Sequence, residues 1–312
     1  MKYPWVSKPE PNKDGLPTVF YLETAMACNM FCPECAIGSG MTKRIKKILK
    51  LDDFYKISEK IRPYAKMVML HKWGEPLLNK DLSKMIKNVS EYAHVHIMTN
   101  GELFTDEKIE EILTSGIGTL FFSIDGVTQD VYEIYRVGGK LETVINNLKK
   151  VKNFIDKNNI EVDLIAQFIA FQHNEHQIDD FKKFCESINV RFHIRSAYVR
   201  FGKIKMTTKK EYQRFAYENL EDQLQAISKC SFLDGLMTIT VSGEILLCSQ
   251  DYDASFSLPN ILDPNQTVET IWNNIKFLEL RNKIKNKNPP KLCKTGCTLF
   301  PQKDHREKLL RS

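Results

Sequence analysis

The chain has 312 residues, a net charge of +6 and eight cysteines. This length can bury a large core, and one barrel-sized domain with a smaller second domain is the expected organisation. The positive charge lies in lysine-rich stretches such as residues 43–47 without a nucleic-acid-binding motif, which favours solvated helix faces over a nucleic-acid surface. No apolar run approaches the ~18 residues of a membrane span, and residues 1–5 do not begin a signal peptide. We therefore expect a cytoplasmic protein without a membrane partner, whose cysteines bind metal or react rather than form disulfides.

Strand-like and helix-like segments alternate after a proline-rich, extended N-terminal arm at residues 1–18. The expected strands cover residues 19–23, 67–70, 95–98, 119–124, 162–171 and 190–194, and the expected helices cover 51–61, 82–92, 106–113, 141–155 and 177–188. This alternation favours parallel strands joined by right-handed crossovers. The predicted fold is therefore α/β, with a partial (β/α)6 barrel of the TIM type over residues 19–200.

A charged, helical bridge is expected over residues 201–229, and a second domain over residues 230–312. Strands at 236–240 and 245–247 flank a Val-Ser-Gly-Glu hairpin turn, and the apolar spacing over 267–284 predicts an amphipathic helix. Four cysteines lie in this hairpin–helix–loop frame: Cys230, Cys248, Cys293 and Cys297. They can saturate one metal centre, and a tetrahedral zinc ribbon is one form that it could take.

Three further cysteines, Cys28, Cys32 and Cys35, follow the first expected strand directly. Their spacing can point three thiolates at one face of a cubane cluster from a single loop, which leaves one iron without a protein ligand. An open metal position is typical of a site that does chemistry on a bound molecule. Half of a zinc site is the alternative interpretation, because zinc also uses tightly spaced cysteines.

Cys28, Cys32 and Cys35 match the CxxxCxxC signature of the radical S-adenosylmethionine (SAM) superfamily. The resemblance implies that the open iron of a [4Fe–4S] cluster binds SAM, and that one electron cleaves SAM to a 5′-deoxyadenosyl radical, which abstracts hydrogen from substrate. One position departs from the family pattern. The residue before the last cysteine is often aromatic or apolar and frames the adenine, whereas here it is Glu34.

The second half resembles the twitch domain, an abbreviated SPASM domain. Gly243 followed by four residues and Cys248 matches its pattern, as do the paired late cysteines. The resemblance implies an auxiliary [4Fe–4S] cluster that four cysteines hold completely, with electron transfer as its use. It also implies a reducing partner such as flavodoxin or ferredoxin.

Candidate SAM and substrate contacts follow successive strands, where the loops of such barrels carry the site. Residues 73–76, Trp-Gly-Glu-Pro, look like the family's GGE motif, and residues 135–139 resemble the YRxGG run of SPASM proteins. The predicted cofactor-binding residues are Gly74, Glu75, Asn100, Ser123, Asp125, Arg136 and Gln167. Arg195, at the end of the sixth strand, is a candidate catalytic or substrate contact. His94 and His96 are interpreted as structural.

The leading functional hypothesis is oxidation of a secondary alcohol of a sugar or aminocyclitol, because one saturated cluster can accept the electron left after hydrogen abstraction. A carbohydrate epimerase is the alternative, and it would need a hydrogen-atom donor. Cys185 is the leftover cysteine and so the candidate donor, although its apolar helix face favours a buried core thiol. Two further alternatives are a peptide-modifying maturase, for whose leader-binding module residues 1–18 leave no room, and a zinc-stabilised RNA-binding protein.

Overall fold

The computed structural model describes residues 9–199, 201–213, 230, 232–248, 251–290 and 293. Its described strands form one sheet in the order β6-β5-β4-β3-β2-β1-β7-β8. The strands are β1 (Val19–Leu22), β2 (Met67–Met69), β3 (His94–Thr99), β4 (Thr119–Ser123), β5 (Asp163–Ala170), β6 (Arg191–Ser196), β7 (Leu236–Ile239) and β8 (Ile245–Leu246). Neighbours pair in parallel from β6 to β7, and only β7 and β8 pair antiparallel. The predicted α/β fold with a partial barrel is confirmed.

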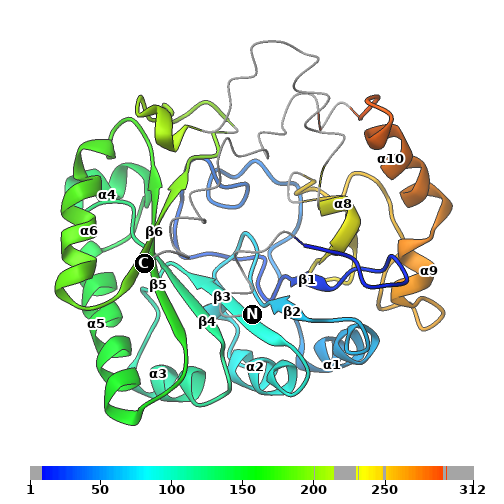
Figure 1. The fold of residues 1–312 in the computed structure, drawn as a ribbon, viewed down its shortest axis with the longest axis horizontal. Helices are drawn as coiled ribbons and strands as arrows, with labels where there is room; N and C mark the ends of the chain where they lie inside the picture. The colour runs from blue at the N-terminus through cyan, green and yellow to red at the C-terminus, as the bar shows by residue number, and fades with distance from the viewer. Residues whose placement is uncertain are drawn as a thin grey trace.

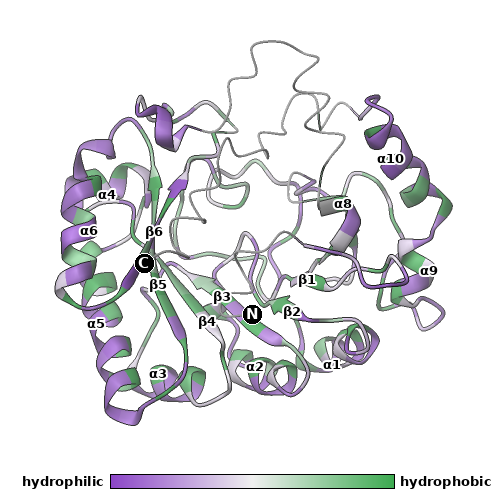
Figure 2. Cartoon of the chain, viewed as in Figure 1, coloured by the Kyte–Doolittle hydropathy of each residue, from purple (hydrophilic) through white to green (hydrophobic). Residues whose placement is uncertain are grey.

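The helices of the first half form an outer layer around the sheet (Figure 1). They are α1 (Leu51–Ile61), α2 (Leu82–Ser90), α3 (Asp106–Leu113), α4 (Gln129–Tyr135), α5 (Leu141–Asn158) and α6 (Ile178–Ser187). Hydrophobic and hydrophilic residues alternate around them, as one-sided burial requires (Figure 2). The sequence pattern does not predict α4, which ends just before Arg136. None of the helices in the described ranges is long and apolar enough to cross a membrane.

The two faces of the sheet carry different residues, because side chains alternate along a strand. Phe20, Val68 and Leu120 belong to the main core, under the helices. The opposite face carries a separate apolar cluster of Val19, Met67, Phe121, Ile165 and Leu236. We call this the inner face, and we call the edge at which the parallel strands end the carboxyl edge.

The second half of the chain extends the barrel sheet. β7 pairs in parallel with β1, Val19 opposite Leu236, so β1 is an interior strand. The arm also packs here, since the Thr18 N–H donates to the Gly235 carbonyl (3.1 Å) and the Trp272 indole donates to the Gly15 carbonyl (2.9 Å). The short α8 (Phe232–Gly235) leads into β7.

Two expected helices differ in the structure. The helix predicted over 267–284 is two helices, α9 (Val268–Trp272) and α10 (Ile275–Lys285). The break follows from capping: Asn273 ends α9, and the Asn274 side chain accepts the N–H of Lys276 to start α10. In the first part of the predicted bridge, residues 201–213, only one 3₁₀ turn forms, η4 (Lys210–Tyr212). Residues 214–229 lie outside the described residues.

Candidate active site at the cysteine loop

The loop that carries Cys28, Cys32 and Cys35 leaves the carboxyl edge after β1 and is closed at its base by an antiparallel bridge between Ala25 and Ile48. Gly74 presses against this base. A Cβ at Gly74 would lie 2.1 Å from the Ala25 carbonyl oxygen, so a side chain is excluded there. The next residue, Glu75, donates its N–H to the Ala27 carbonyl (2.8 Å). The segment after β2 is therefore fixed to the backbone just before Cys28.

The three thiols lie in surroundings that oppose charge. Cys32 is buried and Cys28 and Cys35 are half-buried. Burial raises the pKa of Cys28 to about 11 and that of Cys32 to about 12, and repulsion from the neighbouring cysteines contributes to both shifts. Within the described ranges, no three His, Cys, Asp or Glu side chains gather around one ion. This donor set fits a cluster, in which each thiolate binds its own iron and the metal charge offsets the desolvation.

Asp125 and Arg136 form a buried ion pair beside Cys32. The Arg136 Nε donates to Asp125 Oδ2 (2.6 Å), and Nη1 lies 3.8 Å from the Cys32 Sγ. The second carboxylate oxygen of Asp125 accepts the N–H of Ile169 (2.6 Å). Burial opposes the charge of Arg136, but the Asp125 carboxylate raises its pKa well above the usual value. Asp125, predicted as a cofactor contact, thus holds the Arg136 guanidinium next to a cluster ligand.

Glu75 joins the ends of β2 and β3. Its Oε1 accepts the Thr99 hydroxyl (2.6 Å) and the Leu77 N–H (3.0 Å), and its Oε2 accepts the Asn100 N–H (2.8 Å). Asn100 in turn donates from Nδ2 to Asn29 Oδ1 (2.8 Å), with the Cys28 Sγ 3.9 Å away. Burial raises the pKa of Glu75, while these hydrogen bonds oppose the shift. The structure therefore brings Glu75 and Asn100 together beside the cysteine loop.

Ser123 ends β4, its register partner Gln167 lies within β5, and both are buried. The Gln167 Nε2 lies 3.7 Å from the Met98 sulfur, which belongs to the inner face. Arg195 is half-buried near the end of β6, and its charge reaches His71 after β2. All predicted cofactor and substrate residues among the described ranges therefore lie near the carboxyl edge, except Cys185.

Cys185 lies on the opposite side of the sheet. It is fully buried on α6, in the main core under the helices, and burial raises its pKa to about 12. Its neighbour on the same helix face, Phe181, packs against Phe168 with ring centroids 5.0 Å apart. This placement agrees with the expected buried core thiol, and the sheet lies between Cys185 and the inner face.

The described cysteines of the second half are Cys230, Cys248 and Cys293, while Cys297 lies outside the described residues. Cys248 follows β8 and is 7% exposed, and Cys293 follows α10 and is 8% exposed. Cys230 is half-buried and packs against the same core that contains Cys293. Their assignment as ligands of one centre stays a prediction.

Sequence reasoning missed the role of Glu34. The side chain is 5% exposed, and its Oε2 accepts the N–H of Phe201 (2.6 Å). Its Oε1 accepts the N–H groups of Lys203 (2.6 Å) and Ile204 (3.1 Å). The departure from the family pattern at this position was the available signal, but a single sequence does not show which backbone a carboxylate will bind.

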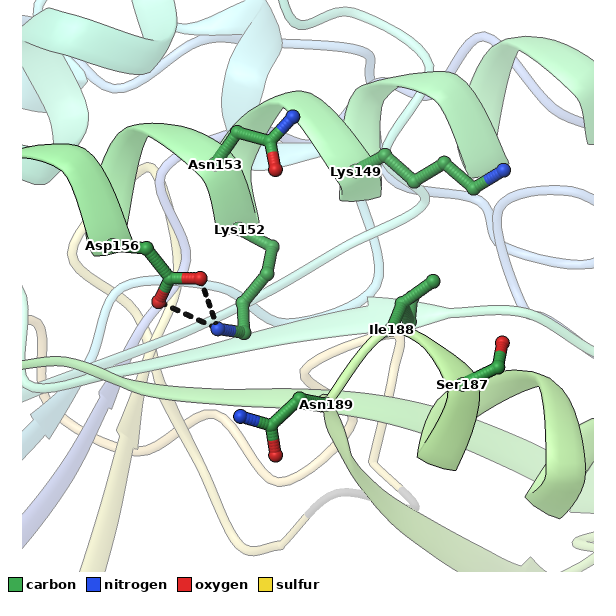
Figure 3. A pocket seen from close by; sticks show the side chains of 7 residues that line it. All are labelled: Lys149, Lys152, Asn153, Asp156, Ser187, Ile188 and Asn189. Carbon is green, nitrogen blue, oxygen red and sulfur yellow. Dashed lines mark hydrogen bonds and ion pairs between the residues drawn. The ribbon is translucent and has the colours of Figure 1, made fainter.

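A hollow lies away from the cysteine loop, between α5 and the turn that leads from α6 into β6 (Figure 3). Its volume is about 410 Å³, and its lining residues are Lys149, Lys152, Asn153, Asp156, Ser187, Ile188 and Asn189. Lys152 forms an ion pair with Asp156 on the same helix. The lining holds no predicted site residue, so this hollow provides a control surface for experiments on the carboxyl edge.

Comparisons with solved structures agree with this geometry. Streptococcus suis SuiB bound to S-adenosylmethionine aligns with a TM-score of 0.68 at 16% identity, covering 91% of this chain and 73% of that one. BtrN in complex with AdoMet and 2-DOIA aligns with a TM-score of 0.57 at 19% identity, covering 89% and 92%. Native anSMEcpe with bound AdoMet and a Cp18Cys peptide aligns with a TM-score of 0.60 at 14% identity, covering 90% and 89%. At these identities the likeness shows the fold.

Curated relatives include a GTP 3′,8-cyclase of Clostridium botulinum, 25% identical over 170 residues, with 53% of this chain and 52% of the relative covered. A GTP 3′,8-cyclase of Listeria welshimeri is 25% identical over 191 residues, with 59% and 55% covered. The chain thus spans about half the length of the curated relatives it matches.

An iron–sulfur cluster-binding domain model, SPASM, matches residues 230–298, and the model of the radical SAM superfamily matches residues 22–185. The two domains bring SAM, a [4Fe–4S] cluster and an auxiliary iron–sulfur cluster as cofactors, and the chain belongs to the radical SAM superfamily.

Proposed function

We propose that this radical SAM enzyme oxidises a secondary alcohol of a small hydroxylated substrate. The observation that carries the proposal is the direct contact between the cysteine loop and the second domain. Asp253 Oδ1 accepts the Thr42 hydroxyl (2.8 Å) and the Lys43 N–H (2.9 Å). Electron transfer weakens with distance, so an auxiliary cluster held in this domain is well placed to accept an electron from chemistry at the loop.

A second contact between the two halves is buried. Glu23, which follows β1, forms an ion pair with Arg44 of the cysteine loop and accepts the N–H of Val241 (3.2 Å). Burial raises the pKa of Glu23, and Arg44 opposes the shift. Because a buried carboxylate needs its partners, both halves hold the loop in one position.

The [4Fe–4S] cluster that Cys28, Cys32 and Cys35 would hold, together with SAM, would supply the abstraction of one hydrogen atom from the substrate carbon. The chain's own residues then decide the outcome. Loss of the hydroxyl proton and of one electron turns the carbon radical into a ketone, and the electron passes to the second domain. Ser123 and Gln167 are suited to hold substrate hydroxyl groups, Arg136 shields Cys32, and Glu75 positions Asn100.

The solved neighbours support oxidation of a small molecule and, as an alternative, modification of a peptide. BtrN, in a complex with 2-DOIA, aligns over 89% of this chain, which favours the small-molecule reaction. SuiB and anSMEcpe, with bound peptides in their structures, favour a peptide-modifying maturase as the alternative. The GTP 3′,8-cyclases match only about half of this chain. An epimerase would need a donor thiol, and Cys185 is buried away from the inner face.

The decisive experiment separates the two clusters. Anaerobically reconstituted protein should hold about eight iron and eight sulfide ions per chain. Replacing Cys230, Cys248 and Cys293 by alanine should halve this content, keep SAM cleavage and abolish formation of the oxidised product. Replacing Cys28, Cys32 and Cys35 should abolish SAM cleavage but keep the other half of the iron. Full product formation without the second cluster would refute oxidation through the second domain, and loss of all iron from the second variant would refute two separate clusters.

A further inference from the structure

Arg195 points to the inner face of the sheet. In the β5–β6 pairing, Gln167 lies opposite His193 and Ile169 lies opposite Arg195, so His193 and Arg195 share one face. His193 contacts Phe121 of the inner-face cluster, with ring centroids 6.3 Å apart. The Arg195 guanidinium therefore stands on the inner face, one layer nearer the carboxyl edge than His193.

Arg195 has no hydrogen-bond or ion-pair partner within the part of the chain that the structure describes. The acidic side chains near the carboxyl edge are already engaged. They are Glu23 with Arg44, Asp125 with Arg136, and Glu34 and Glu75 with backbone N–H groups. A half-buried guanidinium without an acid is uncommon, because its desolvation is not offset. Within the described chain, therefore, none of these carboxylates forms an ion pair with Arg195.

His71 follows β2, and its ring is within reach of the Arg195 charge. Its ring lies 5.0 Å from that of His96 and 5.5 Å from that of Tyr21. Burial lowers the pKa of His71 to about 3, and the charges of Lys72 and Arg195 contribute in the same direction. His71 is thus a neutral hydrogen-bonding group in a positive field. The His96 Nδ1 is buried and has no hydrogen-bond partner among the described residues.

We propose that Arg195, on the inner face at the end of β6, binds an oxyanion group of the substrate, a carboxylate or a phosphate. The inference deepens the proposed function, since it concerns the substrate of the same site. A guanidinium presents paired N–H donors that fit an oxyanion, whereas an ammonium group would meet like charge and no available acid. The enzyme would therefore select an acidic sugar or cyclitol and reject an amino sugar. Of the two substrate classes expected from the sequence, this proposal keeps the sugar and excludes the aminocyclitol.

The test measures binding and needs no turnover. Oxyanion binding can therefore be refuted while the proposed oxidation stands, and the oxidation can be refuted while oxyanion binding is confirmed. Holoenzyme saturated with SAM is dialysed against labelled inorganic phosphate, and one site per chain is expected. Glucuronate and glucose 6-phosphate should compete, and the stronger competitor distinguishes a carboxylate from a phosphate. Glucose and glucosamine should not compete. Absence of phosphate binding, or equal competition by glucosamine, would overturn the proposal.

Variants assign the site. Arg195→Gln should weaken phosphate binding on the order of tenfold or more, since one charged donor is lost, while Arg195→Lys should retain part of the affinity. Lys149→Gln, at the hollow of Figure 3, removes an equal charge elsewhere and should leave binding unchanged. Cluster absorbance checks that each variant is folded. If Arg195→Gln instead keeps phosphate binding, or weakens the affinity for SAM equally, the guanidinium does not serve the substrate.

Discussion

Replacing Glu34 should release the segment after β6 from the cysteine loop. The Glu34 carboxylate lies between two predicted cluster ligands and accepts three backbone N–H groups, those of Phe201, Lys203 and Ile204. These residues are about 170 positions away in sequence, so no local structure can replace the contact. The carboxylate therefore joins this segment to the cysteine loop, and an antiparallel bridge between Phe171 and Met206 holds the segment farther along.

The magnitude follows from the bonds removed. A hydrogen bond to a charged group contributes about 1.5–3 kcal/mol, and a donor left without an acceptor costs more when buried. Glu34→Ala removes both acceptor oxygens and with them all three hydrogen bonds. Because water can replace part of this hydrogen bonding, the free energy of local opening should fall by about 3 kcal/mol. Glu34→Gln keeps one acceptor oxygen but turns an N–H₂ group toward Phe201 or Lys203, and it should cost about half as much.

Hydrogen exchange of the holoenzyme measures this opening directly. Peptides that contain residues 201–204 should exchange about a hundredfold faster in Glu34→Ala and about tenfold faster in Glu34→Gln, at about 1.4 kcal/mol per factor of ten. Glu175 provides the matched control, since it accepts the Thr208 N–H (2.7 Å) and also binds the Thr207 hydroxyl. Glu175→Gln should loosen residues 207–208 and leave 201–204 protected. Unchanged exchange at 201–204 in Glu34→Ala would show that the Glu34 carboxylate does not hold this segment in place.

Three further predictions concern buried groups. Glu75→Gln should weaken SAM binding by about 2 kcal/mol and leave the iron content unchanged, because one amide oxygen cannot accept both the Asn100 N–H and the Thr99 hydroxyl. If calorimetry shows unchanged affinity for SAM, Glu75 is not part of the site. His71 has a pKa of about 3 when folded, so the unfolded chain binds its proton first as the pH falls below about 6.5. Anaerobic urea titrations should show stability falling by up to about 1.4 kcal/mol per pH unit from this group, and His71→Gln should remove that part of the slope. Cys185→Ala should keep turnover and lose about 1 kcal/mol of stability, whereas loss of product with SAM cleavage intact would favour an epimerase.

The sequence predicts the barrel half well because its signals are local. The apolar runs, helix lengths and turn residues place the strands and helices within a few residues, and α1 and α3 begin and end where they are expected. The strand-end motifs fall together because parallel strands must end at one edge of the sheet. Residues such as Glu75 and Asn100 could therefore be predicted to meet before any contact between them was known.

The remaining features depend on contacts between distant segments, to which single-sequence patterns are blind. The residues next to Asp125 do not predict that its carboxylate pairs with Arg136. The residues next to Glu34 do not predict that it accepts backbone N–H groups of residues 201–204. The helix predicted over 267–284 has the right apolar residues, but the side chain of Asn274 starts a new helix inside it. Here a local cap overrides the periodicity, and the pattern alone does not show which signal prevails.

The pairing of β1 with β7 has a consequence for how the two halves depend on each other. β1 lies between β2 and β7, and the cysteine loop starts directly after it. Without β7, one side of β1 would expose unpaired backbone groups, and Glu23 would lose the Val241 N–H from its buried contacts. β1 and the Glu23 carboxylate, which hold the three-cysteine loop, would therefore lose partners. The two matched domains are separate in sequence, with the second beginning at residue 230, but the sheet joins them into one structural unit.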